Sequence, residues 1–187
     1  MQTGFYHHPA VPTAAALPLL SLGGYQGHLK QALTALKYDG NRHLARPLGY
    51  ALGSRWQAYP LKTRQPPLVV PIPLHTKKLR ERGFNQAELL ADAFCQQTGL
   101  TLIRQGLVRQ RETEPQFGLG VKARQHNLEG AFRLGSAFQG DRPNRPVLLF
   151  DDIYTTGTTV RSAASVLRHY GISVCGVGAI TQATLDC

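Results

Sequence analysis

Apolar residues recur at two different spacings along the chain, and together these predict an α/β fold. Between residues 29 and 56 they fall at helical intervals in two runs separated by Asp39-Gly40-Asn41, which predicts two helices joined by a tight turn. Continuous apolar runs at 68–73 and 147–150 are typical of strands covered on both faces of a parallel sheet. Strand and helix patterns alternate from there onward. We therefore expect a doubly wound, mostly parallel sheet with an N-terminal helical segment.

Local signals predict the remaining elements. Asn85, with Glu88 three residues later, forms the N-cap of a helix, and Gly99 supplies its left-handed C-cap. A second helix is expected over 158–170, ended by Gly171. Strands are expected at 101–108 and 172–180, a strand or turn at 131–134, and an extended loop at 111–125.

The length of 187 residues suits one domain with a single core. Three prolines and few charges predict an irregular arm over residues 1–20. The domain then covers 21–187, with a helical segment at 21–60 and an α/β core at 66–187. Because no apolar run reaches about 18 residues and the start lacks a secretory pattern, we expect a cytoplasmic protein with no membrane insertion.

Composition and charge narrow the function classes. With 42% hydrophobic and 17% charged residues, the chain is typical of globular proteins and not of disordered ones. Its three cysteines are widely spaced and form no C-x-x-C pair, so neither a disulfide framework nor a zinc site is supported. The net charge of +10 predicts attraction to phosphates, in nucleic acid, nucleotides or a phosphorylated metabolite. Charge alone does not choose among these.

Cations are concentrated between residues 62 and 82, where Glu81 is the one acid. The basic residues of this stretch are Lys62, Arg64, Lys77, Lys78, Arg80 and Arg82. A solvated basic loop explains this stretch as well as a binding role does.

The segment 147–159 reads as a strand, a polar turn and the start of a helix, the place where open parallel sheets bind ligands. Its turn is Thr155-Thr156-Gly157-Thr158-Thr159. Hydroxyls, backbone N–H groups at a helix N-terminus and a glycine suit a phosphate. The turn contains no lysine and no Walker A pattern, which argues against a nucleoside triphosphate. Asp151 and Asp152 just before it suit a sugar diol or Mg²⁺, so a ribose 5-phosphate fits both halves.

The residues 147–159 resemble the phosphoribosyl pyrophosphate (PRPP) binding motif of type I phosphoribosyltransferases. Further segments resemble signatures of the ComF family, which is associated with bacterial competence. These segments are Tyr25-Gln26-Gly27, Leu36-Lys37-Tyr38, Arg80-Glu81-Arg82-Gly83-Phe84-Asn85-Gln86, and Arg124 with Asn127, Gly130, Ala131 and Phe132. The resemblance spans about residue 22 to the end. The chain contains no counterpart of the cysteine-rich zinc module with which family members often begin.

The resemblance implies a type I phosphoribosyltransferase fold, PRPP as ligand and Mg²⁺ as cofactor. Asp151 and Asp152 would meet the ribose hydroxyls and could hold Mg²⁺, while residues 155–159 would bind the 5-phosphate. Pyrophosphate would lie at the loop after the strand that ends at Pro73, near the candidate cations Lys77, Lys78, Arg80 and Arg82. The segment 111–125 would be a hood loop that closes over the sugar.

Two functions follow from this reading and are not exclusive. The first is a Mg²⁺-dependent phosphoribosyltransferase that releases pyrophosphate and acts in DNA uptake. The second is a non-catalytic PRPP-sensing module that binds single-stranded DNA and works with a competence helicase. A PRPP-responsive transcription factor is a weaker reading, because the chain has no helix-turn-helix candidate. The sequence names no acceptor, general base or oligomeric state.

Overall fold

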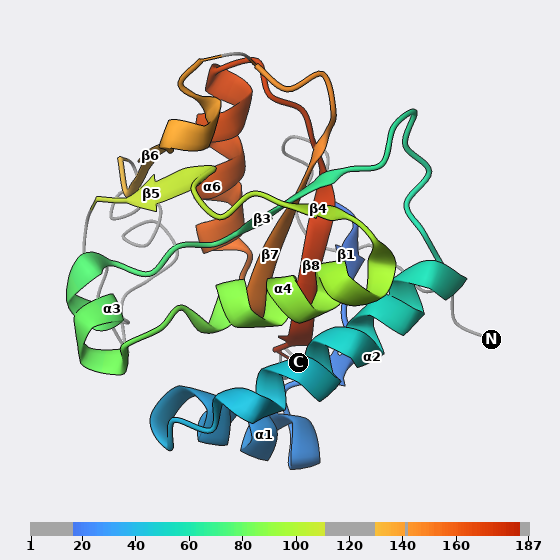
Figure 1. Cartoon of the computed structure of the whole chain (residues 1–187), viewed down its shortest axis with the longest axis vertical. Helices are drawn as coiled ribbons and strands as arrows, with labels where there is room; N and C mark the ends of the chain where they lie inside the picture. Colours follow the sequence, from blue (N-terminus) through green and yellow to red (C-terminus); the bar gives the residue numbers. More distant parts are fainter. Residues whose placement is uncertain (1–16, 111–129, 141, 184–187) are drawn as a thin grey trace.

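The computed structural model describes residues 17–110, 130–140 and 142–183 (Figure 1). Its main sheet contains β1 (Leu19–Leu20), β2 (Gly23–Gly24), β3 (Leu68–Pro71), β4 (Thr101–Leu102), β7 (Val147–Tyr154) and β8 (Val174–Gln182). These strands run in the order β1-β8-β7-β3-β4, with β2 also on β8, and every pairing is parallel. The expected parallel α/β sheet is confirmed.

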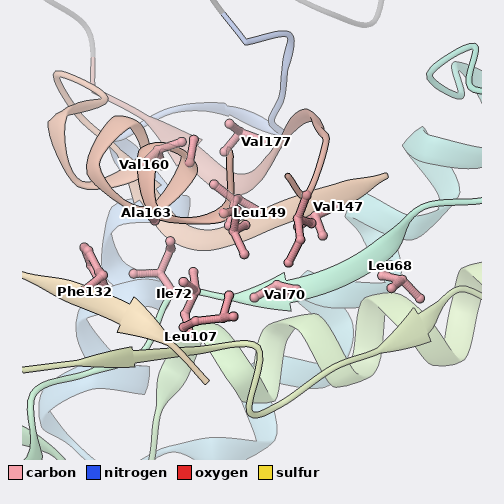
Figure 2. Packing of buried hydrophobic residues seen from close by; sticks show 14 of the residues in the cluster. Leu68, Val70, Ile72, Leu107, Phe132, Val147, Leu149, Val160, Ala163 and Val177 are labelled. Atoms are coloured by element: carbon pink, nitrogen blue, oxygen red, sulfur yellow. The ribbon is translucent and has the colours of Figure 1, made fainter. Parts of the chain in front are cut away.

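Helices cover both faces of this sheet, as Figure 1 shows. The helices of the described residues are α1 (Gly27–Tyr38), α2 (Ala45–Ala58), α3 (Thr76–Arg82), α4 (Gln86–Thr98) and α6 (Thr158–His169), with short 3-10 turns at Arg42–Leu44 and Ser136–Phe138. On one face, α1, α2 and α4 pack against Val69, Leu148 and Phe150. On the other, α6 and a small antiparallel sheet, β5 (Leu107–Arg109) with β6 (Phe132–Leu134), pack against Val70 and Leu149 (Figure 2). This alternation along β3 and β7 explains their continuous apolar runs.

The helical predictions are confirmed in detail. The side chain of Asn85 accepts a hydrogen bond from Ala87 N at the start of α4, and Gly99 ends that helix with φ 73°. Residues 29–56 form α1 and α2, and α6 ends at His169, two residues before Gly171. No helix among the described residues has the length and apolar character to cross a bilayer.

Four expectations about local structure are wrong. The end of the expected arm, Leu19–Leu20, is a buried strand, because it pairs with β8. Residues 101–108 do not form one strand: β4 joins the main sheet and β5 the small one. The strand at 147–150 continues to Tyr154, since β8 pairs with it that far. The end of the basic stretch is the helix α3 and not a loop. The arm's first 16 residues and the segment 111–125 lie outside the described residues.

Helices α2 and α4 pack in close contact at Gly49 and Gly53. A Cβ on Gly49 would lie 2.6 Å from Ala93 Cβ and 2.7 Å from Leu90 O, and one on Gly53 would lie 2.6 Å from Gln97 Cγ. The two backbones therefore approach one another only because both positions lack a side chain.

We predict that Gly49→Ala lowers the free energy of unfolding by about 1–3 kcal/mol, because overpacking outweighs the better helix propensity of alanine. Urea denaturation measures this change. Gly140→Ala is the matched control, since a Cβ there meets nothing within 4 Å. Equal stability of Gly49→Ala and the control would contradict the tight contact.

Candidate functional site

The turn between β7 and α6 occupies the carboxyl edge of the sheet, and its conformation depends on Gly157. This residue is buried and left-handed, with φ 71°, and serves as the N-cap of α6 without a capping side chain. A Cβ there would lie 2.3 Å from Tyr154 Oη. Only glycine fits, and the first N–H groups of a twelve-residue helix begin just beyond it.

The threonines of the predicted turn surround this helix start. Thr155 and Thr156 are exposed, whereas Thr158 and Thr159 are partly buried. Thr156 Oγ1 and Thr158 Oγ1 share a hydrogen bond of 2.7 Å. Hydroxyls, N–H groups and the positive end of the helix dipole together favour an anion.

Arg161 is a residue of this turn that the sequence analysis missed. Its Nη1 donates to Thr156 O at 2.8 Å and its Nη2 to Thr158 Oγ1 at 3.2 Å. The guanidinium therefore braces the turn and adds a positive charge beside it. The sequence did contain a signal for this contact, because Arg161 follows Thr158 by three residues in the expected helix, a spacing that brings two side chains together on one helix face.

Asp151 and Asp152 lie on β7, beyond the last residue of β7 that pairs with β3. Asp152 is buried, with 5% of its surface exposed, and Asp151 is partly buried. The Lys37 ammonium, from the end of α1, lies 2.5 Å from Asp152 Oδ2. Lys37 belongs to a segment that the sequence analysis quoted without giving it a role.

Burial and neighbouring charges shift the pKa values of Asp151 and Arg109. Burial first, and then the neighbouring carboxylate of Asp152, raise the pKa of Asp151 well above its usual range, although Lys37 acts in the opposite direction. Burial also lowers the pKa of Arg109 on β5, and the Asp151 charge partly counters that effect. Arg109 thus adds a cation on the side of Asp151 that faces the small sheet.

The loop after β3 forms the other side of the site. From β3 the chain proceeds through α4 to β4 on one side, whereas β7 leads through α6 to β8 on the other, so the sheet order reverses between β3 and β7. Ligands of doubly wound sheets bind outside the strand ends at such a point. Ile72 N donates to Phe150 O at 2.8 Å, and Asn85 Nδ2 donates to Ile72 O at 3.1 Å. The loop that the resemblance assigns to pyrophosphate therefore begins beside Asp151.

The four candidate cations of this side, Lys77, Lys78, Arg80 and Arg82, all lie on α3, directly after the loop. Arg82 also donates to Gln86 Oε1 at 2.5 Å, and its guanidinium lies 5.7 Å from the centre of the Tyr38 ring. The structure thus brings together the quoted segments around Lys37, Arg82 and Asp152. Of the last quoted segment, Arg124 and Asn127 lie outside the described residues.

The side chains available as ligands determine how a metal ion could bind at this site. The described ranges contain no cluster of three or more His, Cys, Asp or Glu side chains. Mg²⁺ commonly binds through one or two carboxylates together with the phosphates of a substrate. The carboxylates of the described residues would therefore hold a magnesium ion only together with further oxygen ligands from a bound phosphate group, and do not form a complete metal centre by themselves.

Curated proteins resemble the chain over most of its length. It is 32% identical over 169 residues to competence protein F of Haemophilus influenzae, covering 88% of this chain and 72% of that protein. It is 30% identical over 177 residues to DNA utilization protein YhgH of Salmonella typhi, with coverage of 88% and 74%. Competence protein ComFC of Bacillus subtilis is 28% identical over 151 residues, with coverage of 79% and 56%.

No family model matches the chain. Among solved structures, adenine phosphoribosyltransferase of Leishmania tarentolae aligns with a TM-score of 0.46 and 11% identity, covering 88% of this chain and 90% of that one.

We predict that Asp151→Asn stabilises the protein at neutral pH. A raised pKa means that ionised Asp151 costs folding stability, and each pKa unit corresponds to about 1.4 kcal/mol. Below about pH 4 the carboxyl is protonated in both the folded and the unfolded chain, so the difference vanishes there and grows as the pH rises. Urea denaturation from pH 4 to pH 8 measures this difference, and we expect the variant to be more stable than the wild type at pH 7, by a margin that increases over this range.

Asp92→Asn provides the control for this measurement, because Asp92 is a half-exposed carboxylate on α4 that pairs with Arg104. We expect no gain from it. A loss of stability in Asp151→Asn at pH 7 would show that ionised Asp151 supports the fold.

Proposed function

Because the chain belongs to the family of competence protein F, we propose that it binds PRPP with Mg²⁺ at the carboxyl edge of its sheet and transfers the phosphoribosyl group. The observation that carries the proposal is the direct succession of Asp151, the left-handed Gly157 and the N-terminus of α6. A carboxylate that can accept hydrogen bonds from a sugar diol therefore lies one short turn before backbone N–H groups that can bind a phosphate. The competence and DNA utilization names of the relatives support a role in DNA uptake.

Each part of the site has a task in this reaction. The 5-phosphate binds at residues 155–159, where Arg161 braces the turn. The pyrophosphate lies at the loop after β3, near the cations of α3. In the transfer, the bond between C1 of the ribose and the pyrophosphate oxygen breaks, its electron pair leaves with pyrophosphate, and a nucleophile of the acceptor forms the new bond to C1.

Electrostatics explain why cations surround the leaving group. Pyrophosphate carries several negative charges as it departs, and Lys77, Lys78, Arg80 and Arg82 lower the energy of that charge. Bound Mg²⁺, held by Asp151 and the phosphates, would supply further charge neutralisation. Positive charge develops on the sugar at the same time, and in this proposal the Asp151 carboxylate would stabilise it.

We predict that the protein binds PRPP in the presence of Mg²⁺, as measured by isothermal titration calorimetry, and that two variants lose affinity at least about 100-fold. Asp151→Asn removes the carboxylate, and Gly157→Ala forces a Cβ toward Tyr154 Oη in a left-handed turn. Asp92→Asn is the control, since it changes a carboxylate far from the turn. No binding to the wild-type protein, or full binding to Asp151→Asn, would reject the proposal.

A second function, binding of single-stranded DNA, is favoured by a surface beside the site. We call it the arginine–aromatic surface, and it contains Arg42 over Phe84 at 4.6 Å, Arg46 over Tyr50 at 5.3 Å and Arg82 over Tyr38 at 5.7 Å. Tyr38 is 74% exposed. Tyr38 is the exposed ring of the three, since Tyr50 is partly buried and Phe84 is 8% exposed, so a base would stack on Tyr38 while the arginines neutralise phosphates.

We predict that a labelled oligothymidylate binds with an affinity that falls steeply with salt, as measured by fluorescence anisotropy. Arg46→Gln is expected to reduce the salt slope by about 0.7, and Tyr38→Ala to weaken binding by roughly 5- to 100-fold. Arg168→Gln, on α6 at the other face of the sheet, is the matched control. Salt-independent binding, or an equal effect of the control, would contradict this function.

A further inference from the structure

Lys37 and Asp152 form a buried ion pair that links the N-terminal helical segment to the strand of the site. Their side chains are only 14% and 7% exposed, with Nζ 2.5 Å from Oδ2. The Lys37 ammonium is therefore the partner that compensates the charge on Asp152 Oδ2. Because both groups are largely removed from water, solvation stabilises neither charge well, and each charge is stabilised mainly by its partner.

The second oxygen of Asp152 is also engaged. Ile153 N donates to Asp152 Oδ1 at 2.8 Å. One oxygen thus faces a protein cation and the other accepts from the backbone, while the residue is 5% exposed. Little of this carboxylate remains for a ligand.

Asp151 differs from its neighbour in each of these respects. It is partly accessible, and its Oδ1 accepts a hydrogen bond from Asp152 N at 2.8 Å. The two carboxylates therefore have different partners. Lys37 pairs with the Asp152 carboxylate, and the backbone N–H of Asp152 donates to the Asp151 carboxylate.

We propose that the two adjacent carboxylates have separate roles, in which Lys37 is a positioning residue that holds Asp152 as an anion of the fold, and Asp151 alone meets the sugar hydroxyls or their magnesium ion. This inference rests on the proposed function for the ligand of Asp151. It replaces the expectation that both carboxylates bind the ribose in the same way.

The first test uses the ligand-free protein and thermal unfolding. Lys37→Met and Asp152→Asn each leave a buried charge without its partner, and we expect each to lower Tm by about 5–15 °C. The double variant recovers most of this loss, and Lys37→Arg, which keeps the charge, stays near the wild type. Lys37→Met combined with Asp151→Asn gains no more stability than Asp151→Asn gains by itself. Additive losses for Lys37 and Asp152 would overturn the role given to Lys37.

The second test measures PRPP binding with Mg²⁺ by calorimetry, on variants that are folded at the working temperature. We expect Lys37→Met/Asp152→Asn to stay within about tenfold of the wild type and Lys37→Arg to bind like it, whereas Asp151→Asn loses at least about 100-fold. If the folded double variant loses as much as Asp151→Asn, Asp152 itself contacts the ligand and the inference is wrong. Failure of the wild type to bind would reject the proposed function and the ligand role of Asp151, while the unfolding cycle still decides the role of Lys37.

Discussion

A strand that is buried on both faces and ends in two carboxylates must have its charge compensated within the protein. β7 buries Val147 to Phe150 completely and then carries Asp151 and Asp152 to the edge of the sheet. Lys37 compensates one of these charges from α1, and Arg109 approaches the other from β5. Cations thus come from the layers on both faces, so the local charge balance of the site depends on how both layers pack against the sheet.

The helical segment before the sheet is therefore part of the site as well as part of the core. Leu33 and Leu36 anchor α1 in the apolar layer, and Lys37 follows directly at the edge of that layer. The same helix end presents Tyr38, which packs under Arg82 of α3. Helices that are distant in sequence thereby meet at one edge of the sheet, beside both the turn between β7 and α6 and the loop after β3.

The sequence predicted those features whose signals are local. The Asn85 and Gly99 caps, the apolar run of β7 and the glycine of the turn before α6 each act within a few residues, and all are found in the structure. Features set by distant partners were missed. Leu19–Leu20 is a strand only because β8 lies beside it, and the pairing of Lys37 with Asp152 joins residues more than a hundred positions apart. No periodicity encodes such contacts. Arg161 was missed although its signal is local, because a helical arginine usually faces solvent.

The glycines of α2 have a consequence for the opposite side of the site. They let α2 and α4 pack so closely that α4 is held in place, and Asn85 at its start keeps hold of Ile72 O. The loop after β3 is thus preorganised by helix packing, before any ligand arrives. Conformational entropy that a free loop would lose on binding has already been lost during folding. Under the proposed function, the departing pyrophosphate would meet a surface there whose shape is already set by folding.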